Sequence, residues 1–139
     1  MAPRTQLDAL VGVLESRQDW LARTHAHTLQ ALAASREAEV CLLERIALEK
    51  PAAATADEWR ASEQRVERLR LELHGQQDTT RRCSEDEAAA KASLTAAHRR
   101  VETLRKASDR IRAGIMRARD KAESREHDEL ALLRFQHAG

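Results

Sequence analysis

The residue types that could bind a metal ion or catalyse a reaction are scattered along this chain of 139 residues. His25 and His27 lie two residues apart, and on a helix that spacing turns their side chains to different faces, so they cannot share a metal ion. The other histidines stand alone, without an HExxH motif or a Cys/His cluster. They are His74, His98, His127 and His137. We therefore expect solvated surface histidines and no metal site.

Motifs of catalysis are missing from the sequence as well. There is no glycine-rich phosphate loop, and no Ser/His/Asp or paired-carboxylate arrangement has a pocket to occupy. Cys41 and Cys83 lack CxxC spacing and fall too far apart along a helical hairpin to form a disulfide, so we expect two reduced, semi-buried thiols. The sequence predicts a protein that is not an enzyme and binds no cofactor.

Charge offers a different kind of chemistry, the selection of a binding partner. Ten basic residues and only three acidic residues lie between Lys91 and Lys121. Among them Arg105, Arg112 and Arg119 repeat every seven residues beside an apolar stripe, the position that selects partners by charge in coiled coils. Two interpretations stay open, a solvated flank and a surface for an acidic partner. Nucleic acid fits less well, because no aromatic residues interleave with the arginines and the net charge is only +1.

The element that must position these arginines is a long helix with one heptad register. The register predicts a helix that packs along another helix in a left-handed coiled coil. Its middle is weakened by three polar members. We call this set the heptad stripe: Trp59, Val66, Leu73, Thr80, Glu87, Leu94, Val101, Ser108, Ile115 and Ala122, with Ser62, Leu69, Gln76, Cys83, Ala90, Ala97, Leu104, Ile111 and Ala118 three residues further on.

Composition supports an all-α fold. Charged residues make up 34% of the chain and aromatic residues 2%, and no alternating pattern rich in β-branched residues predicts a strand. No apolar run approaches the roughly 20 residues needed to cross a bilayer, so we expect no membrane insertion. The first ten residues lack a signal-peptide core, which predicts a cytoplasmic protein.

Pro51 divides the chain into two helices. A helix should end near Glu49, and Thr55 with Glu58 forms a capping-box pattern for the next one. We expect helices over about 5–49 and 56–135, joined by a linker at 50–55, in a single domain over 1–139. So short a linker predicts a two-helix antiparallel coiled-coil hairpin with a longer second helix.

Two irregularities qualify this hairpin. The heptad of the first helix is clear at Leu7, Leu14 and Leu21 but slips near Leu29, as a stutter would make it. Gly75 costs the second helix about 1 kcal/mol relative to alanine, so a break there and three helices in all remain an alternative. The register that continues across Gly75 favours one helix.

The second helix is too long for the first to cover. At 1.5 Å per residue the helices would be about 67 Å and 120 Å long, so coverage should end at about residue 104. Apolar residues beyond that point need another partner, and the free protein should self-associate through them. They are Ile111, Ile115, Ala118, Leu130, Leu132 and Leu133.

The end of the chain resembles the closing motif of the FliJ/YscO family. In that family a charged helix ends in a basic run followed by Asp-Glu, a hydrophobic residue and Ala, and Asp128, Glu129, Leu130 and Ala131 match this order. A tryptophan about 70 residues earlier, Trp59, is similar to the one in flagellar FliJ. The bias towards alanine and arginine is most similar to the Hrp branch of plant-associated bacteria.

The resemblance implies a central stalk component of type III secretion. Such a protein would enter the hexameric secretion ATPase, link it to the export gate protein at the inner membrane, and also bind export chaperones. We expect Leu130 and Leu133 to be apolar anchors, with Asp128 and Glu129 pairing with basic loops of the ATPase ring. The alternatives are a self-assembling coiled coil or export chaperone, and a basic nucleic-acid-binding coiled coil.

Overall fold

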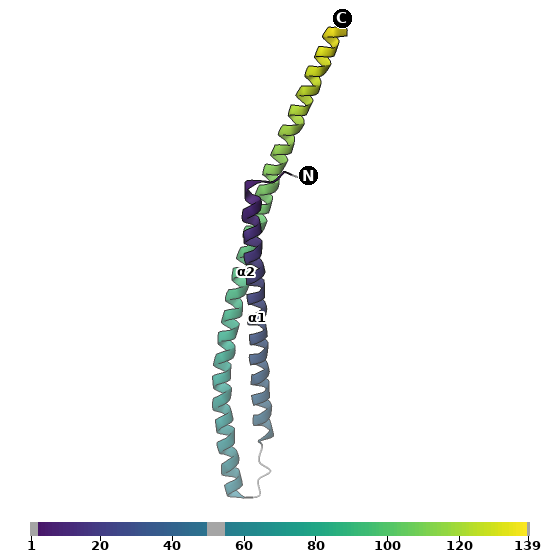
Figure 1. Cartoon of the computed structure of the whole chain (residues 1–139). Coiled ribbons are helices and arrows are strands. Elements are labelled where there is room, and N and C mark those ends of the chain that lie inside the picture. Colours follow the sequence, from purple (N-terminus) through teal and green to yellow (C-terminus); the bar gives the residue numbers. More distant parts are fainter. Residues whose placement is uncertain (1–2, 50–54, 139) are drawn as a thin grey trace. The chain divides into compact units, whose positions relative to one another are not determined.

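The computed structural model describes residues 3–49 and 55–138, and these form two helices (Figure 1). Helix α1 spans Gln6–Leu48 and helix α2 spans Ala56–Ala138, with no strand among the described residues. The prediction of an all-α hairpin with a longer second helix is confirmed. Pro51 and most of the expected linker lie outside the described residues. The capping pattern holds, because the Glu58 backbone N–H donates to Thr55 Oγ1 at 3.2 Å.

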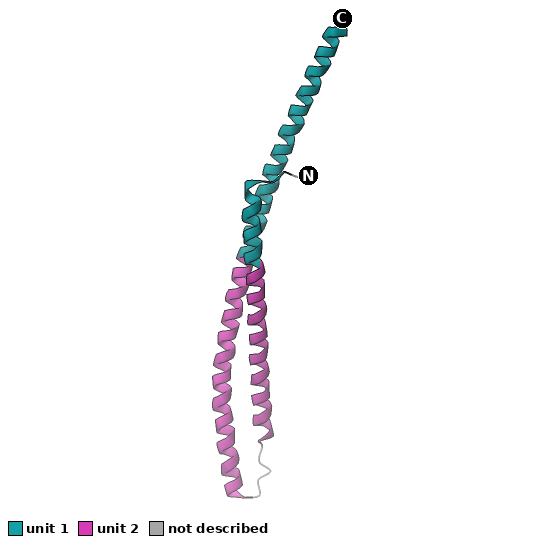
Figure 2. Cartoon of the chain, viewed as in Figure 1, with its two compact units in different colours: residues 1–18, 97–139 teal, residues 19–96 magenta. Residues whose placement is uncertain are grey.

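The chain divides into two compact units (Figure 2). Unit 1 contains Met1–Gln18 and Ala97–Gly139, and unit 2 contains Asp19–Ala96. Within each unit a part of α1 lies antiparallel beside a part of α2, as the contacts between the two helices show. In unit 2, Glu49 contacts Ser62 and His25 contacts Glu87. The expectation of a single domain remains a prediction.

The heptad stripe faces α1 as predicted. Every member from Ser62 to Ser108 is buried or half-buried, while most of the residues between them are exposed. The best-covered members include Leu69 at 6% exposure and Val101 at 0%. Trp59, the first member, is 48% exposed. The stripe is therefore the line along which α2 is covered, although it includes five polar residues in this range: Ser62, Gln76, Thr80, Glu87 and Ser108.

The predicted slip in the first helix is wrong. The covered residues of α1 keep one heptad spacing throughout, with no stutter near Leu29. Leu29 itself is 45% exposed and Leu43 is 52% exposed, because each lies one position beside the covered line. The apolar pattern misled because polar residues occupy the covered positions there. The covered line of α1 is Leu7, Val11, Leu14, Gln18, Leu21, His25, Thr28, Leu32, Ser35, Glu39, Leu42, Ile46 and Glu49.

Polar members of the two covered lines are hydrogen-bonded across the helix pair. In unit 2, Ser35 Oγ accepts from Gln76 Nε2 at 2.7 Å and lies 2.7 Å from Thr80 Oγ1. His25 Nε2 lies 2.9 Å from Glu87 Oε1. Because each of these groups has a partner at only one offset of the helices, they fix the register at some cost in stability.

Gly75 lies inside α2 and does not break it, so the three-helix alternative is wrong. A Cβ added at Gly75 would meet nothing within 4 Å. The flexibility of glycine in the unfolded chain is then the main effect of this residue on stability.

We predict that Gly75→Ala raises the free energy of unfolding by about 0.5–1 kcal/mol, because alanine loses less backbone entropy in a helix and has room here. Urea denaturation followed by far-UV circular dichroism measures this difference. A destabilised variant would contradict the open surroundings of Gly75.

We predict that Ser35→Ala lowers the free energy of unfolding by about 1–2 kcal/mol, because Gln76 and Thr80 each lose a hydrogen bond in a half-buried position and keep only one bond to a backbone carbonyl. The same denaturation experiment on the triple variant Ser35→Ala, Gln76→Leu and Thr80→Val should give a protein at least as stable as the wild type, since the whole polar layer is then apolar. A triple variant with a lower free energy of unfolding than Ser35→Ala alone would show that the polar layer stabilises the fold in addition to fixing the register.

Candidate protein-interaction site

All the residues expected to bind partners lie on α2 within unit 1. The structure separates them into a group that α1 already contacts and a group that it leaves exposed. The first group contains Arg105 and Arg112. The second group lies within the range from Met116 to Ala138, in which every residue is exposed, and contains Arg119, Asp128, Glu129, Leu130 and Leu133. Ile111 is 46% exposed and Ile115 is half-buried, at the border between the two.

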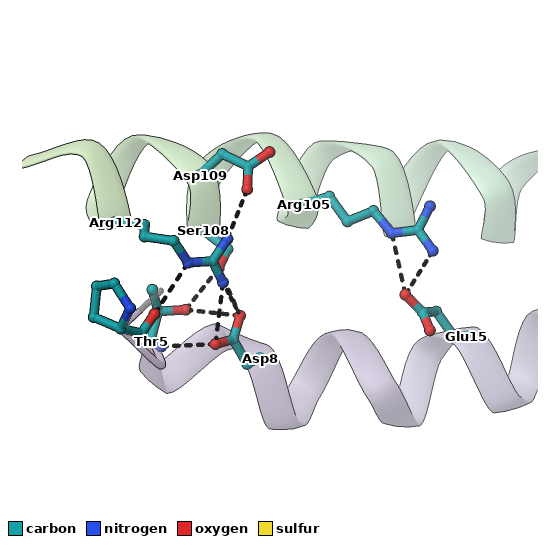
Figure 3. Close-up of polar contacts among 8 residues, drawn as sticks. Thr5, Asp8, Glu15, Arg105, Ser108, Asp109 and Arg112 are labelled. Carbon is teal, nitrogen blue, oxygen red and sulfur yellow. Dashed lines mark hydrogen bonds and ion pairs between the residues drawn. The ribbon is translucent and has the colours of Figure 1, made fainter. Parts of the chain in front are cut away.

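Arg105 pairs with an acidic residue of α1. Its Nε and Nη2 atoms donate to Glu15 Oε1 at 3.1 and 2.6 Å, as Figure 3 shows. Both side chains are about half exposed, so water and salt screen the pair, and a contribution of at most about 1 kcal/mol is expected. The pair shows which turn of α1 lies beside Arg105.

Arg112 makes the densest set of contacts in unit 1. Its Nη2 donates to both carboxylate oxygens of Asp8, at 3.1 and 3.3 Å, and its Nε donates to the Pro3 carbonyl at 3.0 Å (Figure 3). Nη1 donates to Asp109 at 2.9 Å. The guanidinium therefore ties the start of α1 to α2, and the Arg112 side chain is only 29% exposed.

Asp8 also caps its own helix. The Thr5 backbone N–H donates to Asp8 Oδ2 at 2.8 Å, which is one half of a capping box at the start of α1. Ser108, a buried member of the heptad stripe, donates to Asp8 Oδ1 at 2.8 Å. The Thr5 backbone bond, then the Ser108 bond, with smaller contributions from the Thr5 hydroxyl and Arg112, lower the pKa of Asp8 from 3.8 to about 2 against the opposing effect of desolvation.

The expected limit of coverage at about residue 104 is wrong. Thr5 Oγ1 lies 2.7 Å from Ser108 Oγ, and Pro3 reaches Arg112, so α1 and the residues before it cover about two further turns of α2. Equal spacing about the linker would place Glu49 opposite about residue 59. Instead Ser62 Oγ donates to the Glu49 carbonyl at 2.8 Å, so the pairing begins later along α2.

Beyond α1, the heptad stripe has apolar members only as far as Ala122. Continuing its spacing past Ala122 leads to Arg125 and Glu129, which are charged and exposed. The apolar side chains near the end of α2 gather elsewhere: Leu130 is 53% exposed and Leu133 is 51% exposed. These two are three residues apart and so share a helix face. Asp128 and Glu129 precede them, and both are exposed.

The sequence did not point to a hollow that the structure places in unit 2. A pocket of about 550 Å³ has an apolar floor that includes Ile46, Trp59 and Val66, and its α2 wall carries Glu63 and Glu67. Trp59 was expected to be a packed member of the heptad stripe. Instead it is 48% exposed and lines this pocket together with Ile46 of α1, which the sequence alone could not show.

Histidines and cysteines differ in part from expectation. His25 is not a solvated surface residue, since its side chain is 18% exposed and bonded to Glu87. His98 Nδ1 lies 3.0 Å from Gln18 Nε2. Both cysteines are free, and Cys41 is exposed rather than semi-buried. In the ranges 3–49 and 55–138, no group of His, Cys, Asp or Glu residues could hold a metal ion, and neither helix is long and apolar enough to cross a membrane.

This arrangement defines a class of protein: a two-helix hairpin protein whose long second helix is exposed from Met116 to Ala138. The family model of the flagellar FliJ protein matches residues 4–139. The chain therefore belongs to the FliJ family, the stalk family of flagellar and type III export, and is a component of such an export apparatus in general. No curated protein and no solved structure matches the chain significantly. Its assignment to the Hrp branch remains a prediction.

We predict that acid weakens the attachment of α1 in unit 1. The pKa of Asp8 is lower in the folded protein than in the unfolded chain, so its contribution is present above pH 3.8 and is lost as the pH falls towards 2. Thermal unfolding of the wild type and of Asp8→Asn across this range should show a weaker pH dependence in the variant. Asp19→Asn, which removes an aspartate outside this network, should keep the wild-type dependence. Equal pH dependence in all three would contradict the role of Asp8.

Proposed function

We propose that this chain is the central stalk that couples the hexameric secretion ATPase of a type III export apparatus to its export gate protein. The observation that carries the proposal is the uninterrupted exposure of α2 from Met116 to Ala138 in unit 1. A helix of more than five turns without a partner helix has the length and the free surface needed to enter a ring. Family membership supports this assignment to export.

In this proposal Leu130 and Leu133 are the apolar anchors inside the ring. Exposed leucines on one helix face gain by burial, at about 25 cal/mol per Å² of apolar surface removed from water. Asp128 and Glu129 lie beside them and would pair with basic loops of the ATPase. Charges at the edge of an apolar contact give orientation more than affinity.

A coupling protein needs a second surface, and unit 2 offers one. Its pocket combines the apolar floor of Trp59 and Val66 with the carboxylates of Glu63 and Glu67, which form no ion pair among the described residues. This is the surface that we assign to the export gate protein or to export chaperones. The protein would then work at the cytoplasmic side of the inner membrane, joined to the apparatus only by protein contacts.

A second candidate function is self-assembly through the exposed apolar residues of α2. Ile111 at 46% exposure and Met116 at 43% exposure favour it, since a second copy could cover them. In this case the free protein would be an oligomer that does not need the ATPase. Light scattering of the purified chain separates this candidate from the stalk.

We predict that removing residues 126–139 abolishes binding to the cognate ATPase and abolishes secretion, because the anchors are lost. The point variant Leu130→Ala with Leu133→Ala should weaken ATPase binding at least about tenfold. Binding is measured by co-purification and by titration of labelled chain with the hexamer, and circular dichroism checks that helicity is retained.

Leu132→Ala is the matched control for these variants. Leu132 is 62% exposed but lies on a different face of α2 from the two anchors, so its loss should change binding little. Normal ATPase binding by the chain that ends at residue 125 would show that the ring grips another part of the protein.

A further inference from the structure

Two ion pairs in unit 1 repeat with the period of the heptad. Asp8 and Glu15 are seven residues apart on α1, and they bond to Arg112 and Arg105, which are seven residues apart on α2. The earlier acidic residue pairs with the later arginine and the later acidic residue with the earlier arginine, as antiparallel helices require. Acidic side chains at this position of a covering helix are therefore what α2 accepts beside its stripe.

The next arginine of this series has no such partner. Arg119 follows Arg112 by seven residues and forms no ion pair in the described ranges. α1 cannot supply one as a further helical turn, because it begins at Gln6, where the Thr5 backbone N–H donates to the Asp8 side chain as an N-terminal cap. The covering helix stops one repeat short of the arginines.

The heptad stripe also continues beyond the start of α1, alongside Arg119. Ile111, Ile115, Ala118 and Ala122 keep its spacing, and Ala118 and Ala122 are exposed. They extend over about 17 Å, or about three helical turns. Small residues at two of the four positions allow a second helix to approach closely.

Both flanks of this continuation are basic. On a helical wheel Arg119 and Lys121 lie on either side of the stripe, and Asp120 lies on the opposite side of the helix. Lys121 forms no ion pair among the described residues either. An apolar strip with a positive charge on each side is complementary to an amphipathic helix with acidic flanks.

We propose that the continuation of the stripe, Ile111, Ile115, Ala118 and Ala122, is the docking site for an acidic amphipathic helix of a partner protein. That helix lies antiparallel to α2 and extends the helix pair of unit 1 beyond the start of α1. Its acidic residues take the position towards Arg119 that Asp8 takes towards Arg112. The inference rests on the proposed function in one respect, that exposed α2 binds proteins, and it names the chemistry of one partner segment.

Two synthetic helical peptides test this proposal on the full-length chain. Both have three heptads with the same leucine and isoleucine stripe, and they differ only in carrying glutamate or lysine at the flanking positions. Fluorescence anisotropy should show that the glutamate peptide binds about tenfold more tightly, since each pair contributes about 1.5- to 5-fold and like charges repel. Arg119→Glu with Lys121→Glu should reverse the preference, and Ala118→Asp should remove binding of both peptides.

Controls separate the site from general attraction to a basic protein. Arg110→Glu with Arg117→Glu makes the same change in net charge away from the stripe, and it should leave the preference intact. Equal binding of the two peptides to the wild type, or equal effects of the two double variants, would overturn the proposal. The Leu130→Ala with Leu133→Ala variant should bind the glutamate peptide as the wild type does, so failure of ATPase binding and failure of this site are distinguishable.

Discussion

A pair of helices buries only one line of side chains on each partner, and the rest of this structure depends on that constraint. Each helix has two residues in every seven that can leave water, so a polar residue on the line has nowhere else to go. In this protein such residues are tolerated because they meet each other: Ser35 with Gln76, His25 with Glu87, and Thr5 with Ser108. Hydrogen bonding inside a thin core requires a single offset between the helices.

That offset decides which charges lie face to face along the edges. Once Ser108 is paired with Thr5, Arg112 falls beside Asp8 and Arg105 falls beside Glu15. Ion pairs that water can reach, such as these, contribute little to stability. They do, however, occupy two arginines that could otherwise form ion pairs with another protein. Of the three arginines spaced by seven residues, the one that forms no ion pair among the described residues is therefore Arg119, beyond the start of α1. Which arginine this is depends on the polar contacts that fix the offset of the helices, and not on the number of basic residues.

The sequence alone predicted α2 well and α1 poorly, for a physical reason. Apolar periodicity located the covered line of α2 from Leu69 to Leu104 because most of its members are apolar. The same reasoning failed at Ser35, whose hydroxyl has its partners on the other helix, and at Thr28, whose hydroxyl donates to the His25 carbonyl of its own helix. The pairing of Arg112 was also out of reach, since it depends on the offset between the two helices and not on the pattern of either helix alone. The pocket beside Trp59 could be found only with both helices in place.

A single pair of helices leaves most of its side chains exposed. Polar groups on the covered lines bond across the pair, as Ser35 does with Gln76 and His25 with Glu87. The surface beside and beyond the covered line can vary, because a substitution there leaves the contacts between the two helices intact. Leu130 and Leu133 lie on such a surface, and so do Ala118 and Arg119. For a stalk in an export apparatus this separation is useful, because contacts with several partners can change while the polar layers keep the two helices in one register.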